Sequence, residues 1–154
     1  SIDLVIRLLE EDPGAVMSTL ATPIRSRAQL EDPACVKVVF DSHARALYFS
    51  RSPIPHPRQW DDSLLEAEPA IFHQHIGLYA YRREFLLQLA QLPRPLMETT
   101  ESLEQLRVLE AGHTILVGRV DEPTFGIDTA ADYERFVRKQ QVLSAARHSG
   151  ATDK

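Results

Sequence analysis

A strand-like segment at residues 71–81 combines hydrogen-bonding side chains with a glycine. Every second position there is polar, aromatic or glycine, namely His73, His75, Gly77, Tyr79 and Tyr81. Side chains alternate across a strand, so these residues share one face, and that face suits the hydroxyl groups of a sugar. A half-exposed aromatic strand is the alternative interpretation. Zinc is disfavoured, because no second cluster of Cys or His supplies further ligands.

A second segment places polar residues beside an apolar helical stripe. The helix expected at residues 100–110 carries that stripe as Leu103, Leu106 and Leu109. Glu104 and Gln105 lie off the stripe. Spacing alone makes Glu104 a solvated helix residue, and only a nearby ligand would give it another role.

Two further charged residues lie at the ends of expected elements. Arg51 follows the strand expected at 46–50, where an arginine can bridge surface carboxylates or hold a carboxylate ligand through two hydrogen bonds. Asp128 precedes an expected helix, which it can cap. A carboxylate at that point of an α/β fold can also bind magnesium. Spacing does not choose between these roles.

Hydrophobic periodicity predicts the elements that position these side chains. Strands are expected at 15–20, 36–40, 46–50, 71–81 and 114–117, and helices at 2–9, 84–92, 100–110 and 129–141. Strands alternating with helices indicate an α/β layer fold, and the consecutive strands in 34–81 indicate an antiparallel excursion from it. We expect a single α/β domain portion over 1–145 and a disordered tail over 146–154.

The composition is that of an ordinary globular domain, with 154 residues, 44% of them hydrophobic and 25% charged. The net charge of −5 argues against nucleic-acid binding, which needs clustered Lys and Arg. No apolar run reaches the roughly 18 residues of a membrane span, and no signal-peptide pattern opens the sequence. We therefore expect no membrane partner and a cytoplasmic location. Cys35 is expected to be a small buried side chain.

Taken in order, these segments resemble the sugar-acid half of the bacterial CMP-KDO synthetases, the 3-deoxy-manno-octulosonate (KDO) cytidylyltransferases. The matching landmarks are residues 16–21, 36–39, 46–51, 75–81, 103–107 and 126–129. The resemblance implies a Rossmann-like nucleotidyltransferase fold. It also implies an enzyme that joins CTP and KDO into CMP-KDO and pyrophosphate for lipopolysaccharide biosynthesis, and a homodimer formed through residues 36–50.

The same resemblance implies roles for individual residues. Arg51 resembles the arginine that grips the sugar acid, and His75 and Tyr79 resemble its hydroxyl and carboxylate contacts. Glu104 and Gln105 resemble the remaining sugar contacts. Asp128 resembles the second aspartate of a magnesium site, so Mg²⁺ is the expected cofactor and Asp128 a catalytic residue.

Two family features do not occur in this sequence. They are the basic, glycine-containing triphosphate loop and the Gln-Gly-Asp-Glu-Pro segment that supplies the first magnesium aspartate. We therefore expect a missing N-terminal segment and no turnover of CTP by this chain alone. The alternatives are a non-enzymatic sugar-acid-binding or dimerisation remnant, and a related synthetase for another sugar acid such as sialic acid.

Overall fold

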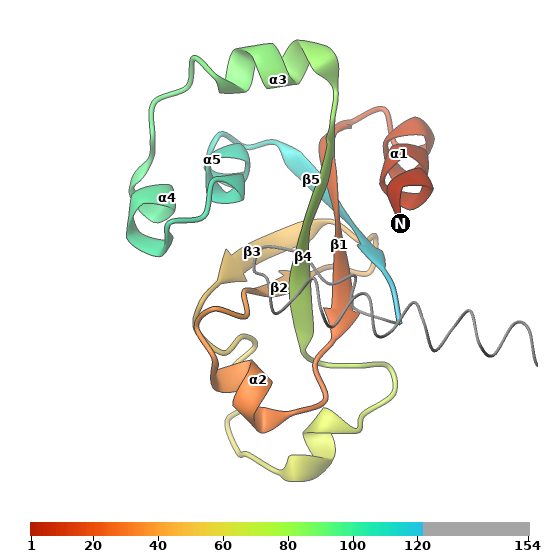
Figure 1. Ribbon diagram of the computed structural model, residues 1–154, viewed down its shortest axis with the longest axis vertical. Helices are drawn as coiled ribbons and strands as arrows, with labels where there is room; N and C mark the ends of the chain where they lie inside the picture. The colour runs from red at the N-terminus through yellow and green to blue at the C-terminus, as the bar shows by residue number, and fades with distance from the viewer. Residues whose placement is uncertain (122–154) are drawn as a thin grey trace, which may run out of the picture. The chain divides into compact units, whose positions relative to one another are not determined.

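The computed structural model describes residues 1–121, which form a mixed sheet flanked by short helices (Figure 1). Its strands are β1 (Ala15–Pro23), β2 (Lys37–Phe40), β3 (Ala46–Ser50), β4 (His73–Tyr81) and β5 (Thr114–Arg119). The strand order is β3-β2-β4-β1-β5. β1 runs parallel to β5 and antiparallel to β4, while β2 and β3 form an antiparallel hairpin. The expected α/β fold with an antiparallel excursion is confirmed.

Short helices connect and cover these strands. They are α1 (Ile2–Glu11), α2 (Arg27–Glu31), α3 (Arg83–Leu89), α4 (Leu96–Glu101) and α5 (Gln105–Glu110), with a 3-10 turn η1 (Asp62–Leu65). Figure 1 shows α1 on one side of β1 and β5, with the α4–α5 pair on the other. Within the described residues, no helix is long and apolar enough to cross a membrane.

β1 illustrates how alternation serves both sides of the sheet. Ser18 turns toward α1, where its hydroxyl donates to the carbonyl oxygen of Val5 at 2.6 Å. Met17 turns the other way and joins the main core, which includes Leu106 of α5 and Phe49 of β3. Gly118 of β5 allows α1 to pack closely, because an added Cβ would lie 3.0 Å from Leu8 Cδ1.

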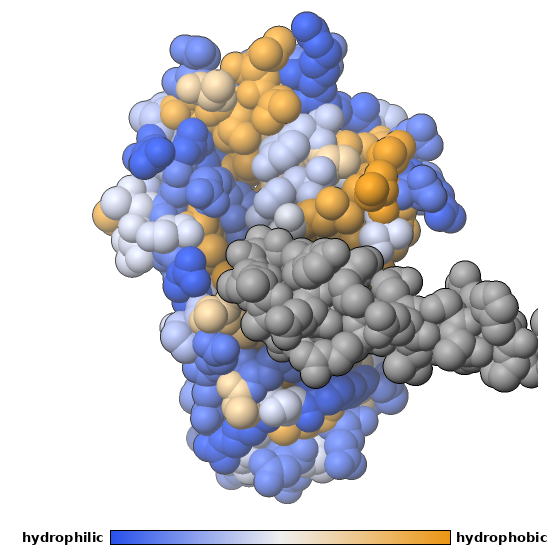
Figure 2. Space-filling model, in the orientation of Figure 1, coloured by the Kyte–Doolittle hydropathy of each residue, from blue (hydrophilic) through white to orange (hydrophobic). Residues whose placement is uncertain are grey.

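A second apolar cluster lies around the loops that join β1, β2 and β4. It is built from Ile24, Leu30, Cys35, Leu65 and Phe72. Cys35 is free and buried, as its position in an apolar run predicts. Apolar side chains also remain at the surface, and Figure 2 shows apolar patches over α3 and over α1. Their most exposed members are Leu87 at 58% and Ile2 at 64%.

The β2–β3 turn reaches across the fold to β5. β3 and β5 stand at opposite ends of the strand order. Nevertheless, the N–H of Val117 donates to the Ala44 carbonyl at 2.8 Å, and Arg45 forms an isolated antiparallel β-bridge with Leu116. Ala44 has a φ of +61°, in the left-handed region. The sheet therefore curls until this turn meets its far edge, and the main core lies inside the curl.

The prediction of a single helix over 100–110 is wrong, because the structure has two short helices in this region. α4 starts earlier, at Leu96, and ends at Glu101, and α5 begins at Gln105. Ser102 lies between them with a φ of +53°. The cause is tertiary, since the Glu101 carboxylate accepts hydrogen bonds from Ser50 and from the main chain of Arg51. Gly112, just after α5, has a φ of +80°, a left-handed conformation that glycine adopts readily at the end of a helix.

Several expectations fall outside the described residues. They are the helix at 129–141, the tail at 146–154 and Asp128 itself.

Candidate functional site

Tyr79 and Gln105 meet where β4 passes the start of α5. The Tyr79 hydroxyl donates to Gln105 Oε1 at 3.4 Å. Gln105 is only 3% exposed, and its Nε2 has no hydrogen-bond partner among the described residues. A buried donor without an acceptor costs about 1–3 kcal/mol. The Gln105 amide therefore supplies N–H groups that a hydroxyl-bearing ligand would satisfy.

His75 extends this polar cluster along β4. Its ring centroid lies 5.4 Å from that of Tyr79, and Phe49 packs edge-on against it at 5.0 Å. Tyr81 lies 6.0 Å from Tyr79 by the same measure. The expected common face thus holds for His75, Tyr79 and Tyr81.

Burial sets the protonation state of His75. It lowers the pKa of the imidazole to about 4, so the ring is neutral at pH 7. His75 Nε2 lies 3.0 Å from Thr19 Oγ1, which is also 3.0 Å from the carbonyl oxygens of Ile76 and Leu78. A hydroxyl has one proton to donate. If Thr19 gives that proton to a carbonyl, it accepts from His75 Nε2–H, and His75 Nδ1 is left as an acceptor.

Thr19 is the residue that sequence reasoning missed. Thr19 is fully buried in β1, opposite a β-bulge in β4. Ser18 pairs with Ala80 and Leu20 with Ile76, so one residue of β1 lies opposite three residues of β4. The Thr19 hydroxyl binds the carbonyls that this bulge leaves without ladder partners. The available signal was a threonine inside the apolar run at 15–20.

Gly77 lies within the same bulge, at the surface. A Cβ added there would meet no atom of residues 1–121 within 4 Å. Neighbouring protein atoms therefore do not require a glycine at this position, and the space beside it is open.

Glu104 lies at the exposed start of α5, near both tyrosines. Burial raises the pKa of Tyr79 and Tyr81, and the charge of Glu104 adds to the rise for each. Both hydroxyl groups therefore remain protonated and able to donate at neutral pH. The apolar stripe of the same segment is confirmed, because Leu103 and Leu106 are buried in the core.

Arg51 is held against the turn between α4 and α5. Its Nε donates to the Glu101 carbonyl at 2.7 Å, Nη1 to the Pro33 carbonyl at 3.0 Å, and Nη2 to the Ser102 carbonyl at 3.4 Å. The guanidinium forms no ion pair within residues 1–121. Three of its five N–H groups are thus occupied, and each terminal nitrogen keeps one for another acceptor.

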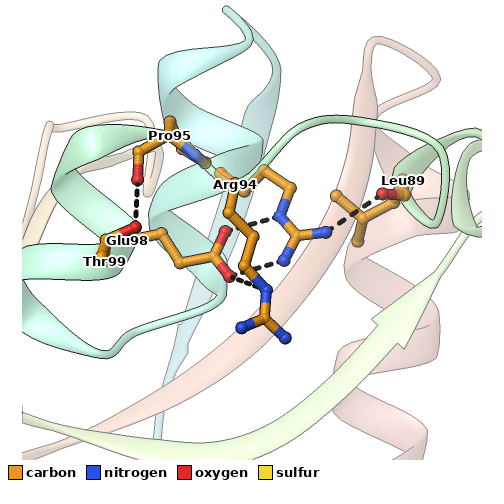
Figure 3. Close-up of polar contacts among 6 residues, drawn as sticks. Leu89, Arg94, Pro95, Glu98 and Thr99 are labelled. Carbon is orange, nitrogen blue, oxygen red and sulfur yellow. Dashed lines mark hydrogen bonds and ion pairs between the residues drawn. The ribbon is translucent and has the colours of Figure 1, made fainter.

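An ion pair joins the two helices that carry this turn. Glu98 of α4 is 7% exposed and Arg107 of α5 is 15% exposed by side chain. Arg107 donates from Nε and Nη2 to the two carboxylate oxygens of Glu98, and Arg94 approaches the same carboxylate at 3.8 Å (Figure 3). Arg107 belongs to the Leu-Glu-Gln-Leu-Arg segment, but its spacing alone gave no indication of this pair.

The structure therefore brings four of the six predicted residues into one cluster, namely His75, Tyr79, Glu104 and Gln105. Arg51 lies at the same α4–α5 turn, through its contacts with Glu101 and Ser102. Surface cavities of about 210, 270 and 370 Å³ are lined by residues outside this cluster. Asp128 lies outside the described residues, within which no group of three or more His, Cys, Asp or Glu side chains is placed to hold a metal.

Comparison with known proteins shows what the chain as a whole is similar to. A family model described as cytidylyltransferase matches residues 1–115. A 3-deoxy-manno-octulosonate cytidylyltransferase from Rhodopirellula baltica is 49% identical over 140 residues, covering 90% of this chain and 56% of that protein. One from Syntrophotalea carbinolica is 46% identical over 136 residues, covering 87% and 54%.

A solved structure gives a similar result. It is a CMP:2-keto-3-deoxy-manno-octonic acid synthetase complexed with CTP, with a TM-score of 0.78 and 40% identity. The match covers 93% of this chain and 56% of that one. The chain spans about half the length of the curated relatives it matches.

Proposed function

Because the chain belongs to the cytidylyltransferase family, we propose that it supplies the sugar-acid-binding part of an enzyme that joins CTP and KDO into CMP-KDO and pyrophosphate. The observation that carries this proposal is the buried Nε2 of Gln105, which has no hydrogen-bond partner among residues 1–121 and lies beside the Tyr79 hydroxyl. Such a pair is costly in an empty core and favourable against a polyhydroxylated ligand. The names of the relatives supply the identity of that ligand.

The cluster offers complementary groups for each part of a sugar acid. Gln105 Nε2 can donate to a hydroxyl oxygen of the ligand. The Tyr79 oxygen, whose own proton is donated to Gln105 Oε1, can accept a hydrogen bond from a ligand hydroxyl, as can Nδ1 of neutral His75. The two remaining N–H groups of Arg51 suit the carboxylate, which arginine binds more strongly than a neutral donor does. Glu104 adds an exposed acceptor beside the tyrosines.

In the proposed reaction, the anomeric hydroxyl oxygen of KDO forms a bond to the α-phosphorus of CTP. The bond from that phosphorus to the bridging oxygen breaks, pyrophosphate leaves, and the hydroxyl proton is released. The residues described here orient the nucleophile, and orientation alone can account for a large share of a rate enhancement. Magnesium, with Asp128 among its ligands, remains a proposal from the family resemblance and would neutralise phosphate charge.

We also propose that the parent protein is a cytoplasmic homodimer that uses residues 36–50. β3 stands at one end of the strand order, and its Leu47 is 61% exposed. An exposed apolar side chain on an outer strand is the kind of feature that a protein–protein interface covers.

Titration of the chain with KDO tests the proposed binding function. With ¹H–¹⁵N NMR, KDO is expected to shift the signals of Arg51, Tyr79 and Gln105, while signals of α1, on the other side of β1 and β5 from the α4–α5 pair (Figure 1), stay unchanged. Sialic acid serves as the competing ligand. Stronger binding of sialic acid would reassign the substrate, and the absence of shifts with either acid would contradict a sugar-acid site.

A further inference from the structure

Lys37 is a buried cation that the proposed site does not use. It lies in β2 with 0% of its surface exposed. Its Nζ donates to the carbonyl oxygens of Asp32 at 2.9 Å and Arg51 at 2.5 Å. In the described part of the chain, no carboxylate oxygen lies within 4.0 Å of it. A buried charge without a counter-ion is destabilising, because no opposite charge offsets the loss of its hydration.

The cost calls for an explanation, because an apolar side chain of similar length would fill the same space. Burial also lowers the pKa of the Lys37 ammonium. The two carbonyl groups that Lys37 contacts belong to residues with different expected roles. Asp32 lies in the loop after α2, whereas Arg51 is the residue proposed to bind the sugar carboxylate.

The other main-chain polar group of Arg51 is held by a second charged residue. Its N–H donates to Glu101 Oε2 at 2.9 Å, and Oε1 of the same carboxylate accepts from Ser50 Oγ at 2.7 Å. Lys37 comes from β2 and Glu101 from α4. The main chain of Arg51 is thus fixed on both sides by charge-assisted hydrogen bonds, which are the stronger kind.

Fixing the main chain also fixes where the side chain starts. The Arg51 guanidinium then donates to the carbonyls of Glu101, Pro33 and Ser102, which leaves two of its five N–H groups for a ligand. A free arginine side chain samples many rotamers, and a ligand that binds it must offset the entropy lost when one of them is selected. Preorganisation removes part of that penalty.

We infer that Lys37 and Glu101 are positioning residues that clamp the main chain of Arg51, so that its guanidinium is preorganised for the carboxylate of an anionic sugar acid. This inference rests on the proposed function for its ligand. The clamp itself is a property of the unliganded chain.

The first test needs no ligand. Hydrogen exchange of the Arg51 Nε–H is followed by ¹H–¹⁵N NMR in the unchanged chain and in Lys37→Met. We expect exchange at least about tenfold faster in the variant, since the hydrogen bond to Glu101 is released more often. The Nε–H of Arg82, which donates to the Ala15 carbonyl at 2.8 Å, is the internal control and should not change. Equal exchange of Arg51 in both proteins would overturn the clamp.

The second test measures KDO binding. Lys37→Met and Arg51→Ala should each raise the dissociation constant about tenfold or more, and the double variant should be no worse than Arg51→Ala, because Lys37 acts through Arg51. Additive losses would show that Lys37 acts independently and would refute the positioning role. If Lys37→Met does not fold, Glu101→Gln takes its place in both tests, because glutamine keeps the shape of the glutamate side chain but removes its charge from the clamp. A failure of the unchanged chain to bind KDO would refute the proposed function and the ligand named here, while the exchange measurement still decides the clamp.

Discussion

Glu98 and Arg107 face one another across the α4–α5 turn, where Arg107 Nε and Nη2 each donate a hydrogen bond of 2.5 Å to a different carboxylate oxygen of Glu98. The residues between them include Ser102 with its left-handed backbone, followed by Glu104 and Gln105 of the candidate site. The pair therefore holds the end of α4 against the start of α5 and fixes the turn between them. Arg107 also donates from Nη1 to the Leu89 carbonyl at 3.3 Å, which ties the turn to α3.

Removal of one partner of this pair should destabilise the protein strongly. Arg107→Met leaves the buried Glu98 carboxylate without its bidentate donor, and we expect a loss of about 3–5 kcal/mol in the free energy of unfolding. Urea denaturation at pH 7 measures it. Arg94→Met is the matched control, because Arg94 is 80% exposed and 3.8 Å away, and it should cost less than about 1 kcal/mol. Equal effects of the two substitutions would show that the pair does not hold the turn.

His75 should make the protein less stable as the pH falls. Its pKa in the folded protein is about 4, below the ordinary value of 6.5. Between pH 6.5 and pH 4 the imidazole is therefore protonated in the unfolded chain and neutral in the folded chain, which favours unfolding. This residue therefore contributes a slope of up to about 1.4 kcal/mol per pH unit in that window and none above it. Urea denaturation of the unchanged chain and of His75→Phe at pH 7 and pH 5 should show the smaller drop in the variant. An imidazole that titrates by NMR near 6.5 would contradict this prediction.

Gln105→Met should separate ligand binding from stability. The substitution removes the Nε2 group, which has no partner among residues 1–121, together with the Oε1 that accepts the long 3.4 Å hydrogen bond from Tyr79. Because these two losses act in opposite directions, the free energy of unfolding should change by less than about 1 kcal/mol. KDO binding should weaken about tenfold or more, because a hydrogen bond of 1.4 kcal/mol corresponds to a factor of ten. Isothermal titration calorimetry measures this, with Gln88→Met on the exposed face of α3 as control. Unchanged affinity in Gln105→Met would exclude the amide from the site.

Gly118→Ala should loosen the packing of α1 on the sheet. The new Cβ would lie 2.9 Å from Leu20 Cδ2, 3.0 Å from Leu8 Cδ1 and 3.1 Å from Leu4 Cδ2. Such overpacking typically costs about 1–3 kcal/mol. Gly77→Ala is the matched control, since nothing lies within 4 Å of its added Cβ, and its thermal midpoint should stay the same or rise. A fall for Gly77→Ala equal to that for Gly118→Ala would reject this explanation.

Leu47→Asp tests the proposed homodimer. A charge at this exposed position on β3 should abolish self-association while leaving the fold intact, because the side chain is 61% exposed within one chain. Sedimentation velocity compares the variant with Leu87→Asp, which places the same charge at a 58% exposed position on α3. Loss of association only in the α3 variant would move the interface away from residues 36–50.

The features of this protein that depend on near neighbours along the chain can be predicted from local sequence patterns. Helical spacing predicts α1, and buried Val5 and Leu9 confirm its inward face. Alternation predicts β4 and its polar face, because the period of two is a property of the extended chain. The resemblance added the family, which the match over residues 1–115 confirms. It also grouped His75 and Tyr79 with Gln105, which no single segment indicates.

Features that depend on contacts between distant parts of the chain could not be predicted in this way. The break at Ser102 follows from contacts between Glu101 and the end of β3, about 50 residues earlier in the chain. The role of Thr19 follows from a bulge that exists only once β1 and β4 pair. The clamp on Arg51 requires a lysine from one strand and a glutamate from a later helix. Local periodicity cannot indicate such arrangements, because their energy comes from groups that folding alone brings together.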